Sequence, residues 1–179
     1  MAEYYLMSQL PSLDGVGENA PLPITEKDFL EVCRRFLGKN ELKELERLTL
    51  LPPRNPVKSS SPLIEKWNEG ERKLRLALAK VRADKMKKSF AVAEGNLSAE
   101  LLQTARTAVE FESPMEAEKF LNDYRLKFLE TLRPMDTFSK DSVFYYCLKL
   151  KLISRMRNFD NEGGKTAYKN IYNSVLNGD

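Results

Sequence analysis

The spacing of apolar residues along the chain predicts helices rather than strands. In most segments apolar residues recur at steps of three and four, as they do on one face of an α-helix. No convincing β-hairpin and no alternation of strands with helices interrupts this pattern. The sequence therefore predicts an all-α protein, a multi-helix bundle of about seven helices joined by short or proline-rich links. A length of 179 residues fits a single helical domain over residues 1–179.

An N-terminal arm or loop is expected over residues 1–23, because prolines and glycines dominate its second half. Its start, residues 4–10, is apolar but too short for periodicity to distinguish a strand from a helical turn. A helix is expected to begin after Thr25, a favourable N-cap residue, and to stop at Gly38. A second helix, over about residues 40–50, would follow as its antiparallel neighbour.

The longest predicted helix covers residues 62–88. A connector rich in proline and serine, residues 52–61, precedes it, and its prolines prevent a helix there. Ser61 is expected to cap the long helix, with Pro62 at its first position. Gly70 should weaken the middle of this helix by about 1 kcal/mol relative to alanine.

Two more predicted helices begin at serine residues. Ser98 is expected to cap the first of them. Ser113, Pro114 and Glu116 form the capping-box pattern with proline at the first helical position, which indicates a helix start. This second helix is expected to end before Pro134.

The most hydrophobic long run is the predicted helix over residues 138–159. Its apolar side chains cover most of the helix circumference, so neighbours or a partner must enclose it. Burial of each large apolar side chain contributes about 1.5–3 kcal/mol before the entropy cost, and this helix should therefore dominate the core. A loop over residues 160–164 should lead to a terminal helix over residues 165–176. The apolar stripe of that last helix consists of Tyr168, Ile171, Tyr172 and Val175.

The residue types argue against catalysis. The chain has no histidine, the commonest general base and metal ligand. Its carboxylates are mixed with Lys and Arg, as on solvated helix faces. The two cysteines, Cys33 and Cys147, lie inside apolar helical patterns and are expected to be small buried hydrophobes. No enzyme activity, cofactor, metal site or small-molecule substrate is therefore expected.

The net charge is only +3, and most basic residues are interspersed with acidic ones. The exception is the basic stretch over residues 72–88, which would suit an acidic partner or RNA, or a solvated helix face. Because no aromatic residues alternate with these cations to stack on bases, the solvated face is favoured and no nucleic-acid binding is expected. The N-terminus lacks the features of a signal peptide, and no apolar run is long enough to span a membrane.

Two segments of the chain resemble known families. Residues 4–13, YYLMSQLPSL, resemble an uncharacterised bacterial family whose members are typically encoded beside the components of V-type rotary ATPases. A second segment is similar to a late helix in the C-type subunit of archaeal-type V/A-ATPases, whose eukaryotic counterpart is the d-type subunit. In that helix a Tyr, a Lys, a branched aliphatic residue and an Arg recur at the spacing of Tyr146, Lys149, Ile153 and Arg157. Leu152 departs from the pattern, since the family helix usually carries an acidic residue there.

The resemblance implies a non-catalytic connector, similar to that C-type subunit, which links the membrane rotor ring to the central stalk of a rotary ATPase. Its partners would be rotor-ring and central-stalk subunits, which would hold it peripherally on the cytoplasmic face of the inner membrane. The partner-binding residues implied are Tyr146, Lys149, Arg155 and Arg157. The three cations also have a simpler interpretation as charges favoured near a helix C-terminus. An alternative function is a free-standing cytosolic helical adaptor or RNA-associated protein that uses residues 72–88.

Overall fold

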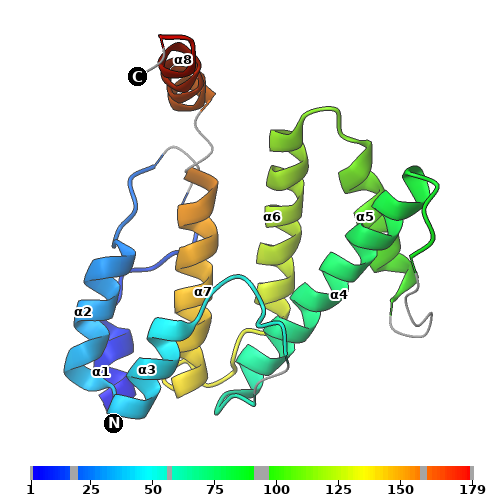
Figure 1. Cartoon of the computed structure of the whole chain (residues 1–179). Helices are drawn as coiled ribbons and strands as arrows, with labels where there is room; N and C mark the ends of the chain where they lie inside the picture. The colour runs from blue at the N-terminus through cyan, green and yellow to red at the C-terminus, as the bar shows by residue number, and fades with distance from the viewer. Residues whose placement is uncertain (1, 17–19, 56–57, 91–96, 158–160, 178–179) are drawn as a thin grey trace.

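The computed structural model describes residues 2–16, 20–55, 58–90, 97–157 and 161–177, and this part of the chain is all-helical (Figure 1). The predicted fold class is confirmed, with eight helices in the described residues rather than about seven. They are α1 (Ala2–Gln9), α2 (Glu26–Phe36), α3 (Lys39–Arg47), α4 (Pro62–Lys85), α5 (Ala99–Glu110), α6 (Pro114–Thr131), α7 (Lys140–Arg157) and α8 (Asn161–Asn177).

Four predicted helix starts are confirmed by their N-caps. In each, the side-chain hydroxyl accepts a hydrogen bond from the backbone N–H three residues further on. This bond satisfies one of the donors that the first turn of a helix leaves without an intrahelical partner. The caps, with their N···O distances, are Thr25 (3.1 Å), Ser61 (3.4 Å), Ser98 (3.2 Å) and Ser113 (3.4 Å).

Three predicted boundaries were wrong. Helix α3 ends at Arg47 rather than near residue 50. Helix α4 ends at Lys85, because Lys87 adopts a left-handed conformation with φ 54° that cannot continue the helix. Helix α8 begins at Asn161, so the loop predicted up to residue 164 is helical from there. The predicted end of the helix at residue 159 and the predicted start of the loop at residue 160 lie outside the described residues.

Within the predicted N-terminal arm, residues 2–9 form helix α1, which decides between the strand and the helical turn that the sequence left open. Leu6 is fully buried, and Met7 and Leu10 pack beside it in the main core. A helix of two turns is not stable alone in water, so tertiary packing rather than propensity holds it in place. Leu13, in the segment that follows α1, is also buried and packs that segment against the main core.

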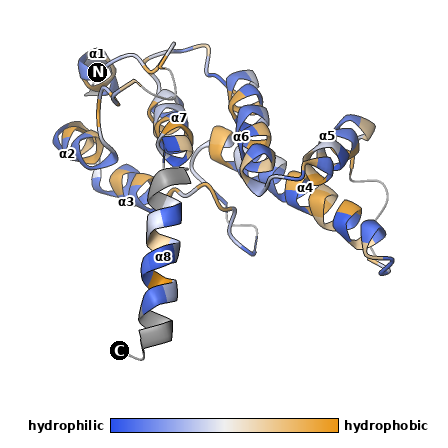
Figure 2. Cartoon of the chain, turned by 90° about the horizontal axis from the view of Figure 1, so that it is seen from above, coloured by the Kyte–Doolittle hydropathy of each residue, from blue (hydrophilic) through white to orange (hydrophobic). Residues whose placement is uncertain are grey.

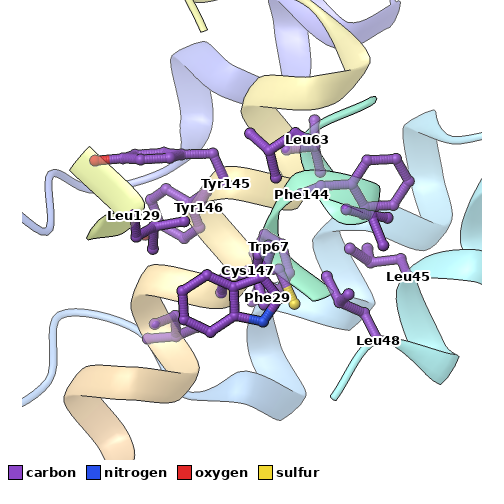
Figure 3. Close-up of a cluster of buried hydrophobic side chains, with 14 of the residues drawn as sticks. Phe29, Leu45, Leu48, Leu63, Trp67, Leu129, Phe144, Tyr145, Tyr146 and Cys147 are labelled. Carbon is purple, nitrogen blue, oxygen red and sulfur yellow. The ribbon is translucent and has the colours of Figure 1, made fainter. Parts of the chain in front are cut away.

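Helix α7 lies at the centre of the main core, as its apolar composition predicts. Leu148, Leu150 and Leu152 are fully buried, and Phe144 is 1 % exposed. Figure 3 shows aromatic and aliphatic side chains from α2, α3, α4 and α6 around it. Both cysteines are buried as expected, and burial raises the pKa of each thiol to about 12.

A second, smaller core joins the later half of α4 to α5 and the first half of α6. Its centre contains Ala77 and Ala105, both fully buried, and Leu74, which is 1 % exposed. Small side chains at a helix interface allow the two backbones to approach closely. Because α4 and α6 contribute to both cores, these two helices connect the halves of the molecule.

Gly70 marks a close contact between α4 and α6. A Cβ atom at this position would lie 2.3 Å from Cε1 and 2.4 Å from Cζ of Phe128. The Phe128 ring is itself stacked on Trp67, with ring centroids 6.1 Å apart. The glycine that weakens the isolated helix therefore makes room for an aromatic ring from α6.

Substitution Gly70→Ala should destabilise the protein although alanine is the better helix former. The gain in helix propensity is about 1 kcal/mol, whereas overpacking a filled contact costs about 1–3 kcal/mol. Denaturant unfolding should give a net loss of up to about 2 kcal/mol. In a Phe128→Leu background the same substitution should become neutral or stabilising, because the ring is gone. A Gly70→Ala protein more stable than the parent would contradict this packing account.

Candidate interaction surfaces

Tyr146 and Lys149, two of the residues implied by the resemblance, anchor the segment after α1. The Tyr146 hydroxyl donates a hydrogen bond of 2.8 Å to the Pro11 carbonyl. The Lys149 ammonium lies 2.5 Å from a carboxylate oxygen of Asp14 and 2.7 Å from one of Glu130. These bonds join α7 to the N-terminal segment and to α6, and only 12 % of the Lys149 side chain is exposed.

The ion pairs of Lys149 shift the ionisation of all three groups. The hydrogen bond and charge of Lys149 hold the pKa of the Asp14 carboxyl below its usual value. Burial raises the pKa of the Glu130 carboxyl, but the hydrogen bonds and nearby cations outweigh burial and leave it lowered. Burial opposes the charged form of Lys149, yet the two carboxylates raise its pKa overall. The cluster is therefore ionised at neutral pH and stabilises the attachment of the N-terminal segment.

Arg155 and Arg157 lie further along α7 and do not join that cluster. The Arg155 guanidinium donates a hydrogen bond of 2.8 Å to Glu118 near the start of α6. Arg157 is half-buried in the last turn of α7. The four residues implied by the resemblance thus divide between two places on α7 rather than forming one patch.

The sequence did not predict a buried ion pair between α4 and α6. The Nε atom of Arg125 lies 2.6 Å from Oε1 of Glu71, and these side chains are 6 % and 2 % exposed. Arg75 approaches the other oxygen of Glu71 at 3.4 Å. Glu71 interrupts the apolar stripe of α4. A carboxylate in such a stripe is costly to bury without a partner, so its position indicates an ion pair inside the fold. The identity of that partner, 54 residues away in the chain, follows only from the packing of α6 on α4.

The basic stretch over residues 72–88 uses half of its eight cations for contacts inside the chain. These contacts pair Arg72 with the Pro53 carbonyl (3.2 Å), Lys73 with Glu69 (2.6 Å), Arg75 with Glu71 (3.4 Å) and Lys85 with the Val109 carbonyl (3.2 Å). Two of these cations thus bond backbone carbonyl groups, and the other two pair with acidic residues one turn earlier on α4.

Helix α8 carries the most exposed apolar stripe of the described chain. Figures 1 and 2 both show α8 projecting away from the other helices, and residues 164–173 are exposed throughout. Tyr168, Ile171 and Tyr172 are 69 %, 65 % and 53 % exposed. The rings of the two tyrosines stack on each other with centroids 6.1 Å apart. The predicted stripe therefore exists on α8 but faces solvent; the side chain of Val175 lies outside the described residues.

A groove of about 650 Å³ lies between α3, the connector and α4. Its carboxylate, Glu44, accepts hydrogen bonds from the hydroxyls of Ser59 and Ser60 and, at 3.0 Å, from the Ser60 backbone N–H.

Among the described residues, no group of three His, Cys, Asp or Glu side chains is placed to hold a metal ion. No described helix is both long enough and apolar enough to cross a membrane.

Comparison with known proteins finds one family. Residues 98–179 match the model of a family described as a protein of unknown function (DUF2764). The matched part runs from the start of α5 through α7 and α8. No curated protein and no solved structure matches the chain.

Substitution Lys149→Met should remove the ion pairs while leaving an apolar stem in place. The expected loss is about 1–2 kcal/mol of unfolding free energy at pH 7, because the carboxylate partners are partly solvated. The loss should depend on pH. Asp14 and Glu130 have lowered pKa values in the fold. Their contribution is therefore present above the ordinary carboxyl range near about pH 4 and disappears as the pH falls through the lower folded values.

Thermal unfolding between pH 3 and pH 7 measures this effect. The difference in Tm between the parent and Lys149→Met should be largest above about pH 5 and shrink below about pH 4. Lys127→Met is the control, since Lys127 is exposed on α6 and carries the same charge. A difference for Lys149→Met that is constant over this range would show that the ion pairs do not hold the N-terminal segment.

Proposed function

We propose that this chain is a non-catalytic helical connector of a V-type rotary ATPase and that α8 is its docking element. The proposal rests on one observation, the exposed apolar stripe of Tyr168, Ile171 and Tyr172 on a helix that projects from the fold. In this proposal the partners are rotor-ring and central-stalk subunits. They would hold the chain peripherally on the cytoplasmic face of the inner membrane.

The exposure of α8 supports a docking role on energetic grounds. Burial of a large apolar side chain contributes about 1.5–3 kcal/mol, and Tyr168, Ile171 and Tyr172 make no such contribution while they face water. Most of the stability of a helix in a protein comes from tertiary packing of its apolar face, and the exposed stripe of α8 does not provide it. A groove on a partner would both cover the stripe and stabilise the helix, which is a common mode of peptide recognition.

The resemblance to rotary ATPase components supports the choice of partner. Its two segments, residues 4–13 and the α7 run, are bonded to each other through Tyr146 and the Pro11 carbonyl. Lys149 adds the bond to Asp14, immediately after the first segment. Within this proposal, Tyr146 and Lys149 position the scaffold, and the direct contact with the ATPase is made by α8. The match to an uncharacterised family over residues 98–179 includes both α7 and α8.

Affinity purification of the tagged chain from native membranes tests the proposal. The parent protein should recover rotary ATPase subunits reproducibly. The variant Tyr168→Asp places a charge in the stripe and should reduce recovery about tenfold or more, since about 1.4 kcal/mol of lost binding energy corresponds to a factor of ten.

The matched control is Asn170→Asp, which adds the same charge on the other side of α8 and should leave recovery unchanged. Both variants should keep the Tm of the parent, because residues 164–173 are exposed. Reproducible absence of ATPase subunits with the parent protein would refute the partner. Equal recovery with Tyr168→Asp and Asn170→Asp would refute the role of α8.

A further inference from the structure

Arginines from three helices meet in a groove between α4, α6 and α7. The groove has a volume of about 290 Å³. We call it the arginine groove; its charged lining residues are Arg75, Arg82, Glu118, Arg125 and Arg155. The sequence separates these residues by up to 80 positions, and the packing of α6 against α4 and α7 brings them together.

Two carboxylates arrange the arginines without neutralising all of them. Glu71 contacts Nε of Arg125 at 2.6 Å and Nε of Arg75 at 3.4 Å. Glu118 contacts Nη2 of Arg155 at 2.8 Å and Nη1 of Arg125 at 3.9 Å. Four guanidinium groups therefore face two carboxylates, which leaves two positive charges in excess.

Two of the guanidinium groups have unused hydrogen-bonding capacity. The side chain of Arg125 is only 6 % exposed, yet its buried Nη1 atom has no hydrogen-bond partner. The carboxylate oxygen of Glu118 at 3.9 Å is too far for a hydrogen bond. The Arg82 side chain has no ion pair or hydrogen bond with the described part of the chain. A buried donor without a partner is costly and is expected to be satisfied by a ligand or water.

We propose that the arginine groove binds a small organic phosphate. A phosphate monoester carries about −1.5 to −2 charges near pH 7, which matches the excess of two positive charges. The planar donor fork of arginine fits phosphate oxygens in pairs, so Arg82 and Arg125 are the expected direct contacts. Leu78 and Leu121, which also line the groove, provide an apolar surface for the organic part of the ligand. The volume of the groove lies just below the lower limit of about 300 Å³ for small-molecule sites, which restricts the ligand to a small one.

This inference does not depend on the proposed connector function, since α8 takes no part in the groove. It assigns a role to Arg155 that differs from a direct contact with the ATPase. With Glu118, Arg155 forms the side of the groove contributed by α7 and α6.

Calorimetric titration of the full chain with inorganic phosphate and with phenyl phosphate tests the proposal. Both probes should bind saturably, and phenyl phosphate should bind more tightly because its ring can lie on Leu78 and Leu121. Arg82→Gln should weaken binding about tenfold or more, through loss of a charge-assisted hydrogen-bonding group. The matched control is Arg106→Gln, an exposed arginine on α5 with the same change in charge, which should have little effect.

Glu118→Gln distinguishes a ligand site from a structural ion-pair network. Removal of the competing carboxylate should strengthen phenyl phosphate binding several-fold, whereas a purely structural network would lose stability and bind no better. Co-sedimentation with phosphatidic acid vesicles separates the sources of phosphate. Vesicle binding that Arg82→Gln abolishes and phenyl phosphate competes would assign the phosphate to a lipid headgroup and overturn the small organic ligand.

Absence of saturable binding of both probes would overturn the proposal. Equal weakening by Arg82→Gln and Arg106→Gln would also overturn it, because the attraction would then be diffuse rather than local to the groove.

Discussion

Helix α7 has to be covered on nearly every side, because apolar residues occupy most of its circumference and α7 lies where the other helices meet. Residues 142–148 are all buried, as are Leu150 and Leu152. This requirement explains why a helix as short as α1 is held in the fold and why α2, α3, α4 and α6 converge on one axis. Leu152 is fully buried, and an ionised side chain at that position would be costly without a partner. The core therefore requires an apolar residue at position 152.

The two cores depend on α4 and α6, which pass through both. Where the cores meet, Gly70 receives the ring of Phe128 and Glu71 binds Arg125. The first contact requires the absence of a side chain, and the second requires a pair of opposite charges shielded from water. Both restrict the register of one helix against the other, since a shift of α6 would expose the glycine and separate the charges. A buried ion pair is weak evidence for stability but can specify one arrangement among several, which fits its position here.

The two surfaces proposed for binding differ in their physical character. The docking proposal for α8 rests on apolar side chains that are exposed to water and that a protein partner would cover. The proposal for the arginine groove rests on positive charge in excess of the two carboxylates, Glu71 and Glu118, which an anion would balance. The stripe on α8 and the arginine groove share no residues, so the two proposals can be tested independently.

Local signals in the sequence were sufficient for the all-α class, for the serine and threonine N-caps, for the burial of both cysteines and for the central place of α7. Each depends on interactions between residues three or four positions apart, or on one side chain's preference for water. Tertiary contacts decided that residues 2–9 form a helix, that Gly70 contacts an aromatic ring and that Glu71 binds Arg125. They also placed Tyr146 and Lys149 against the N-terminal segment and brought Arg75, Arg82 and Arg155 to one groove. These contacts join positions from 19 to 135 residues apart in the chain, and only the packing of the folded helices brings such positions together.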